Sequence, residues 1–181
     1  MPTPVPGALA ADTAPVSPAS PDDVPVLHHP DDDPVRRHLA RLGLPRLLLV
    51  PPTAPPPGGL DSVEDWVRVP AEFDEVAARR RTVLERYQRS TRGVRIDADG
   101  LLRVDDRWID LPDRPRAVAF PLVNHLGRPV PHAVVLEQYL AAGGPSAAAL
   151  RTVVQRLRAR MAGIGLVLHS LRQRGYLLER P

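Results

Sequence analysis

The residues best suited to chemistry lie in the C-terminal half of the chain, and they are arginines. Residues 138–178 contain six Arg and no Asp or Glu. Arg combines a permanent charge with a planar fork of N–H donors that matches phosphate oxygens and base edges. Residues 1–86 have 9 Arg and 13 acidic residues, whereas residues 87–181 have 15 Arg and 8 acidic residues. The basic half therefore predicts a polyanionic partner.

The composition excludes several kinds of site. The 181 residues include no Cys, which excludes disulfides, thiolate metal ligands and cysteine nucleophiles, and no Lys, which excludes lysine chemistry. His28 and His29 precede the acidic residues 31–33, but neighbouring strand residues point to opposite faces, so we expect a strand end and a helix cap rather than a metal site. Three further histidines are isolated and expected to be structural or surface residues: His125, His132 and His169.

Other signatures of catalysis are missing as well. The acidic residues between 97 and 113 surround predicted turns, and we interpret them as solvated loop charges. The sequence shows no nucleophile–base pair, phosphate-binding loop or arrangement of paired carboxylates. We therefore expect no catalytic residues, no metal and no cofactor, and we expect that the protein is not an enzyme.

The N-terminal part predicts a tail followed by a small α/β domain. Residues 1–23 are rich in Pro, Ala, Ser and Asp without periodicity, so we expect a disordered tail. The domain over residues 24–90 begins with a strand at 24–28, then a helix with Asp33 as N-cap and Pro34 in its first position, closed by Gly43. The apolar run at 46–50 predicts a strand covered on both faces.

A loop, a third strand and a long helix complete this domain. Five Pro and two Gly in residues 51–59 indicate an exposed loop. We expect a strand at 65–69 and a helix at 70–89, whose acidic first turns and basic middle suit the helix dipole. The predicted buried side of the helix consists of Phe73, Val76, Ala77, Val83, Leu84 and Tyr87.

The domain over residues 93–181 predicts a short sheet, three helices and a hairpin. The expected strands are 94–97, 101–104 and 107–111. The expected helices are 115–126, one that starts at Pro131, and 146–161. The hairpin is expected at 166–179. Asp99-Gly100 is a hairpin turn signal, and Pro121 should kink the first helix. The second helix should bury Val135, Leu136, Tyr139 and Leu140. The third should begin after the N-cap Ser146 and bury Leu150, Val154, Leu157 and Met161.

This order of elements is that of a winged helix-turn-helix domain. The third helix, residues 146–161, lies where a recognition helix would enter the major groove, and the hairpin at 166–179 is the wing. The exposed Arg, Gln and Thr of the helix suit contacts with base edges. The whole chain is thus predicted to be α+β, with a C-terminal winged helix behind a small α/β domain.

Residues 93–181 resemble the effector domain of OmpR/PhoB-type response regulators. The strongest matches are residues 156–161 (Arg-Leu-Arg-Ala-Arg-Met) and the wing residues 172–176 (Arg-Gln-Arg-Gly-Tyr), with residues 127–130 similar to the turn before the second helix. The chain departs from the family at Leu140, where an aromatic residue is usual, and at Gln173, where the first wing glycine is usual. The Thr and Glu that usually begin the first helix are also missing.

The resemblance implies a role for each exposed residue of the helix and wing. The residues that would contact bases are Arg151, Thr152, Gln155 and Arg156. The residues that would serve phosphates or the minor groove are Arg158, Ser170, Arg172 and Arg174. An exposed arginine-rich helix can also be only a solvated surface, but the match in the wing favours DNA contact.

The N-terminal domain resembles a receiver domain in reduced form. Residues 24–50 look like its opening strand–helix–strand and residues 66–87 like its last strand and helix, with the central part and its phosphoacceptor aspartate missing. Val69 precedes Pro70, where a receiver has its active-site lysine. The resemblance implies a pseudo-receiver that is not phosphorylated and that serves in dimerisation or in binding another protein.

Two hypotheses for function follow. In the first, the protein is a sequence-specific transcription regulator that binds duplex DNA, dimerises through residues 24–90 and is not controlled by aspartate phosphorylation. In the second, it is an adaptor that uses the winged helix or pseudo-receiver to bind a partner such as RNA polymerase. No signal peptide or membrane span is visible in the sequence, so we expect a cytoplasmic, nucleoid-associated bacterial protein without membrane contact.

Overall fold

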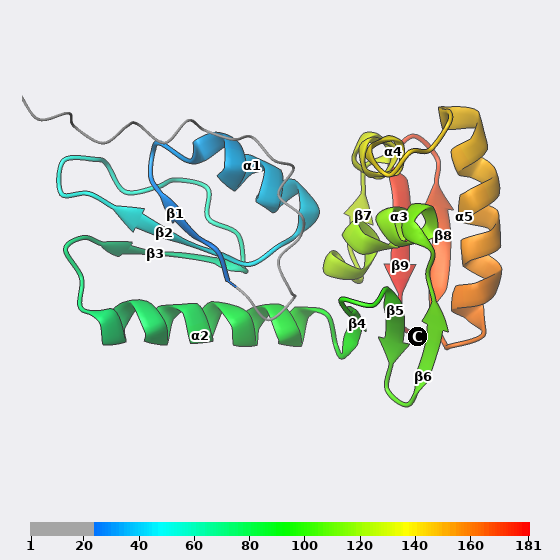
Figure 1. Ribbon diagram of the computed structural model, residues 1–181, viewed down its shortest axis with the longest axis horizontal. Helices are drawn as coiled ribbons and strands as arrows, with labels where there is room; N and C mark the ends of the chain where they lie inside the picture. The colour runs from blue at the N-terminus through cyan, green and yellow to red at the C-terminus, as the bar shows by residue number, and fades with distance from the viewer. Residues whose placement is uncertain (1–23) are drawn as a thin grey trace, which may run out of the picture.

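The computed structural model describes residues 24–181, so the tail predicted for residues 1–23 lies outside the described residues. The described chain forms an N-terminal unit (residues 24–90) and a C-terminal unit (residues 93–181), which lie next to each other (Figure 1). Both units combine helices and strands, which confirms the predicted mixed α+β class.

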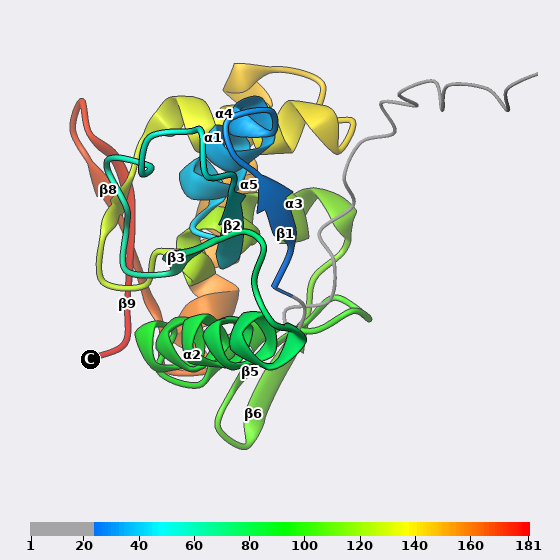
Figure 2. The same ribbon diagram turned by 90° about the vertical axis from the view of Figure 1, so that its left-hand side faces the viewer.

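The N-terminal unit is a parallel sheet between two helices. Helix α1 packs on one face and α2 on the other, as seen from the end of this unit (Figure 2). The sheet has the order β1-β2-β3. The elements are β1 (Val26–His28), α1 (Asp33–Leu42), β2 (Arg46–Val50), β3 (Glu64–Arg68) and α2 (Phe73–Ser90).

Strand β2 lies at the centre of this sheet and is buried on both faces. Leu48 and Val50 belong to the main core with Leu39 and Leu42 of α1, whereas Leu47 packs with Val83 of α2. Successive strand residues point to opposite faces, so one apolar run serves both helices. The predicted bounds and coverage of this strand are confirmed.

The strand order corrects the predicted match to a receiver domain. Receiver-type sheets have the order 2-1-3-4-5, in which the first strand lies between the second and the third. Here β2 lies between β1 and β3, and the order is consecutive. The assignment of residues 24–50 to the opening strand–helix–strand is therefore wrong, because an opening second strand would lie at the edge of the sheet. A consecutive order matches the last three strands of such a sheet.

Two helix starts differ from the prediction. The N-cap of α1 is Asp32 rather than Asp33, and its carboxylate accepts a hydrogen bond from the backbone N–H of His28 at 2.7 Å instead of capping the helix. Helix α2 begins at Phe73 rather than residue 70, and Phe73 is 84% exposed rather than buried. Helical side chains lean toward the N-terminus, so the first residue of α2 projects past the helix end. Gly43 ends α1 at φ 69°, as predicted.

The proline-rich segment 51–59 contains no helix or strand, as predicted. It is nevertheless tied to the unit by arginines. The Arg68 side chain donates to the carbonyls of Pro51 and Ala54 at 2.8 and 2.7 Å, and Arg36 donates to the carbonyl of Gly58 at 2.8 Å. These bonds satisfy carbonyl groups that have no strand partner.

The C-terminal unit has the predicted order of strands and helices, with one further strand, β7, that the sequence analysis did not predict. It opens with an antiparallel sheet of order β4-β5-β6, continues through three helices, and closes with the sheet β7-β9-β8. Helix α3 continues through Pro121. The elements are β4 (Val94–Ile96), β5 (Leu101–Val104), β6 (Arg107–Asp110), α3 (Asp113–Asn124), β7 (Pro129–Val130), α4 (His132–Ala141), α5 (Ala147–Ala162), β8 (Val167–Leu171) and β9 (Gly175–Glu179).

The helices of this unit bury most of the predicted residues. Val135 and Tyr139 of α4 are buried, but Leu140 is 45% exposed, so its predicted burial is wrong. Leu140 is one step around the helix from Tyr139, which takes the inward position. One continuous core joins residues of both units.

Candidate nucleic-acid interface

Helix α5 is oriented by one polar cap and one apolar stripe. The Ser146 Oγ accepts a hydrogen bond from the backbone N–H of Ala149 at 3.3 Å, which caps the first turn. The predicted stripe is buried throughout, with exposures of 0% to 4%: Leu150, Val154, Leu157 and Met161. Burial of this stripe fixes which residues of α5 face outward.

The outward face of α5 carries the four residues predicted to contact bases. Arg151, Thr152, Gln155 and Arg156 are all exposed. Within residues 24–181, the side chains of Arg151 and Arg156 make no hydrogen bond or ion pair. Their guanidinium groups are therefore available to an external acceptor, and their contact with DNA stays a prediction.

Arg158 has an internal role in the structure. Its Nε donates to the Leu168 carbonyl at 2.8 Å, and its Nη2 donates to the Ser170 Oγ at 2.7 Å. These bonds tie α5 to strand β8 of the wing. The predicted role of Arg158 and Ser170 toward phosphates or the minor groove stays a prediction, and in the structure their hydrogen bonds hold the helix and the wing in one geometry.

The wing turn presents two arginines at its tip. Arg172 and Arg174 are exposed, and neither side chain is hydrogen-bonded or ion-paired within residues 24–181. Gln173 between them has φ 63°, a left-handed conformation that glycine adopts more readily. This strained position is where the resembling family has glycine.

Gly175 allows the wing to pack closely against the start of α4. Its φ is 107°, and a Cβ at this position would lie 2.1 Å from the Val130 carbonyl oxygen. The next residue, Tyr176, stacks on His132 with ring centroids 5.9 Å apart. Burial raises the pKa of the Tyr176 hydroxyl, against the opposing charges of Arg151 and Arg158. The tyrosine therefore adds no negative charge to this surface at neutral pH.

Helix α5 and the wing form one continuous basic surface, here called the α5–wing face (residues 146–179). It lies at the end of the molecule opposite the N-terminal unit (Figure 1). Its one acidic residue, Glu179, has its carboxylate 3.0 Å from His169 Nε2, at the far end of the wing from Arg172. An uncompensated basic surface attracts polyanions.

A second basic cluster, which the sequence analysis missed, lies between the two units. Arg89, Arg92 and Arg128 line a cavity there together with His125. These residues come from three separate segments, so their sequence spacing carries no signal. His125 was expected to be a structural or surface residue. Its Nδ1 lies 2.9 Å from the Pro121 carbonyl oxygen.

Residues 24–181 contain neither a metal-binding cluster nor a helix suited to a membrane. This part of the chain contains no cluster of three or more His, Asp or Glu side chains arranged to hold a metal ion. His28, the last residue of β1, is exposed, while His29 lies in the following turn with its side chain 10% exposed and its Nδ1 3.2 Å from Asp33. None of the described helices is long and apolar enough to span a membrane.

Comparison with known proteins finds a likeness among solved structures, but neither a matching family model nor a matching curated protein. Among solved structures, the chain is similar to the C-terminal domain of NsrR, the nisin resistance regulator and a lantibiotic response regulator. The two are 26% identical, and the match covers 49% of this chain and 94% of that one with a TM-score of 0.43.

Proposed function

We propose that the chain is a transcription regulator that binds specific duplex DNA sites through its α5–wing face. The observation that carries this proposal is the set of four exposed, internally unpaired arginines on one face of the helix and the wing tip: Arg151, Arg156, Arg172 and Arg174. A helix of this kind fits the major groove, and an adjacent hairpin reaches the neighbouring backbone or minor groove.

The proposal divides the residues by task. Arg151, Thr152, Gln155 and Arg156 contact base edges from the outward face of α5, and the wing arginines contact phosphates. Arg158 and Ser170 act as positioning residues, because their mutual hydrogen bond of 2.7 Å fixes the wing relative to the helix.

We further propose that DNA binding is not controlled by aspartate phosphorylation. The support is Val69 after β3, at the position where a receiver has its active-site lysine. Incubation with acetyl phosphate should leave the DNA affinity and the oligomeric state unchanged. A phosphorylated species with altered DNA affinity would contradict this part of the proposal. Dimerisation through the N-terminal unit is likewise proposed, and light scattering of the free protein tests it.

Selection of bound fragments from a genomic duplex pool, followed by fluorescence anisotropy, tests the function. The Arg156→Ala variant should lose about 1–3 kcal/mol of affinity for selected duplexes and show relaxed base preference. The matched control is Arg86→Ala, because Arg86 is also exposed but lies on α2, away from the α5–wing face. It should bind like the wild type.

Two outcomes would contradict the proposal. Equal binding by Arg156→Ala and Arg86→Ala would mean that α5 does not contact the bases. Absence of DNA binding at low salt would favour the adaptor hypothesis, in which the same face binds a protein such as RNA polymerase.

A further inference from the structure

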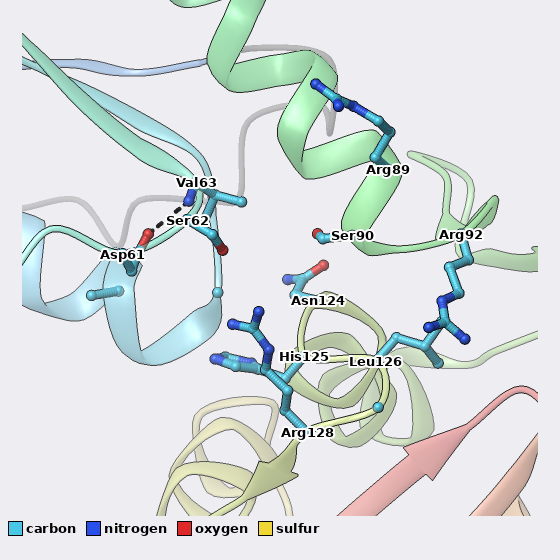
Figure 3. A pocket seen from close by; sticks show the side chains of 13 residues that line it. Asp61, Ser62, Val63, Arg89, Ser90, Arg92, Asn124, His125, Leu126 and Arg128 are labelled. Atoms are coloured by element: carbon cyan, nitrogen blue, oxygen red, sulfur yellow. Dashed lines mark hydrogen bonds between the residues drawn. The ribbon is translucent and has the colours of Figure 1, made fainter.

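A cavity of about 510 Å³ lies at the junction of the two units, and none of its lining residues belongs to the α5–wing face (Figure 3). Its walls come from the end of α1, the segment before β3, the end of α2 with the connection to β4, and the turn after α3. The cavity therefore exists only while the two units are packed together.

Hydrogen bonds across the junction hold the wall in place. The Tyr87 hydroxyl donates to Asn124 Oδ1 at 2.7 Å, and Asn124 Nδ2 donates to the Leu42 carbonyl at 3.0 Å. The His125 ring lies against Gly43, where an added Cβ would be 2.7 Å from Cε1 of the ring. Asn124 is 8% exposed, so these bonds form in a largely dry environment in which polar partners matter most.

The lining carries three arginines without a carboxylate partner in residues 24–181: Arg89, Arg92 and Arg128. Arg89 donates its Nε to the Glu85 carbonyl at 3.2 Å, and the other two side chains make no hydrogen bond within this range. Figure 3 shows Arg92 and Arg128 on opposite sides of the hollow and Arg89 at its upper rim.

The carboxylate of the lining does not neutralise these arginines. Asp61 accepts from Arg46 Nη2 at 2.6 Å and from the backbone N–H of Val63 at 2.9 Å, so both of its oxygens are engaged. The ends of α1, α2 and α3 also meet the cavity, and each adds roughly half a negative charge. Three helix ends offset about half of the three arginine charges, so the cavity stays cationic.

We propose that this cavity binds a small molecule that carries a phosphate dianion. Arginine forks match phosphate oxygens in two-pronged hydrogen bonds, and the hydroxyl of Ser62 in the lining adds a further donor. A ligand held between Arg92 and Arg128 contacts both the connection from α2 to β4 and the turn after α3, with the N-terminal unit as the third wall. It therefore stabilises the packed arrangement relative to separated units.

The test uses inorganic phosphate as the probe and the full chain in ¹⁵N-labelled form. Titration against chloride of equal ionic strength should shift the backbone amide resonances of Ser62, Arg92 and His125 and the side-chain amide of Asn124. The Arg128→Gln variant should weaken phosphate binding about tenfold or more, because it removes charge-assisted hydrogen bonds. Arg92→Gln should do the same. Circular dichroism verifies that both variants fold.

The control variant is Arg172→Gln, which changes an exposed arginine of the wing and should leave phosphate binding in the cavity intact. Shifts confined to α5 and the wing, or phosphate binding that is equal in Arg128→Gln and wild type, would overturn the proposal. DNA binding is measured on the same samples. Loss of phosphate binding in Arg128→Gln with selective DNA binding retained would separate this site from the proposed function.

Discussion

The buried arginines around Glu64 in the N-terminal unit and the arginines of the α5–wing face are used in opposite ways. In the N-terminal unit, Arg36 and Arg46 both bond to the carboxylate of Glu64, and Arg46 is only 2% exposed. On the α5–wing face, Arg151 and Arg156 are exposed and have no such partner in residues 24–181. The first set stabilises the fold, while the second is left available to a partner.

Burial explains why the arginines around Glu64 are paired with a carboxylate and those of α5 are not. Glu64 lies between two arginines, with its Oε1 2.6 Å from Arg36 Nε and 3.0 Å from Arg46 Nε, and its side chain is 0% exposed. The hydrogen bond from Arg36 to Glu64 raises the pKa of Arg36. Charges removed from water need such partners. The arginines of α5 keep their hydration until phosphates replace it and release counterions.

Breaking the buried cluster should have the largest effect on stability. Glu64→Ala removes the buried carboxylate that Arg36 and Arg46 share and leaves Arg46 with Asp61 alone, so the free energy of unfolding should fall by about 3–5 kcal/mol in urea titrations. The matched control is Asp113→Ala, which removes an ion pair whose carboxylate is 83% exposed and should change stability by less than about 1 kcal/mol. Similar losses in the two variants would show that burial does not separate the two classes of charge.

Disrupting the packing of the wing against the start of α4 should have the next largest effect on stability. In Gly175→Ala the new methyl group meets the Val130 carbonyl, at 2.1 Å before any relaxation, and the residue must keep φ 107°. We expect a loss of about 2 kcal/mol or more in unfolding free energy. Gly127→Ala is the control, because its φ is 74° but no atom lies within 4 Å of the added Cβ. It should cost only about 1–2 kcal/mol.

DNA affinity provides a second test of the Gly175→Ala variant. The Gly175→Ala variant should bind DNA more weakly even at temperatures where it is fully folded, because the wing tip shifts relative to α5. The Gly127→Ala variant should bind like the wild type. Unchanged affinity in Gly175→Ala would mean that the wing takes no part in binding.

Relieving strain at the wing tip should have the smallest effect. Gln173 has φ 63°, and Gly removes the steric cost of this left-handed conformation but loses more conformational entropy on folding. The first effect is larger, so Gln173→Gly should raise the unfolding free energy by about 0.5–1 kcal/mol. Thermal and urea unfolding measure the change. Destabilisation instead would show that the Gln173 side chain makes a contribution larger than the strain.

Local signals in the sequence predicted the start and the orientation of α5 well. The spacing of Leu150, Val154, Leu157 and Met161 fixed the inward side of α5, and Ser146 predicted its start. Consequently the sequence alone placed Arg151 and Arg156 on the outward face of α5. The apolar run of β2 likewise predicted its burial. These features follow from periodicity and capping, which depend on neighbouring residues alone.

Tertiary features were not predictable in the same way. The order β1-β2-β3 depends on which strands pair, and no periodicity specifies that. Phe73 looked like a core residue by spacing but lies at a helix start beyond the packed part of the unit. Arg92 and Arg128 meet at the cavity only because α3 packs against α1 and the end of α2.

The most direct test of the central claim is the salt dependence of DNA affinity for the wild-type chain on a selected duplex. If the unpaired arginines of the α5–wing face contact phosphates, the logarithm of the association constant should fall linearly with the logarithm of salt concentration. Each contact should add about 0.9 to the magnitude of that slope, and the slope should shrink by about one unit in Arg172→Ala. A flat salt dependence, or an unchanged slope in Arg172→Ala, would contradict the account.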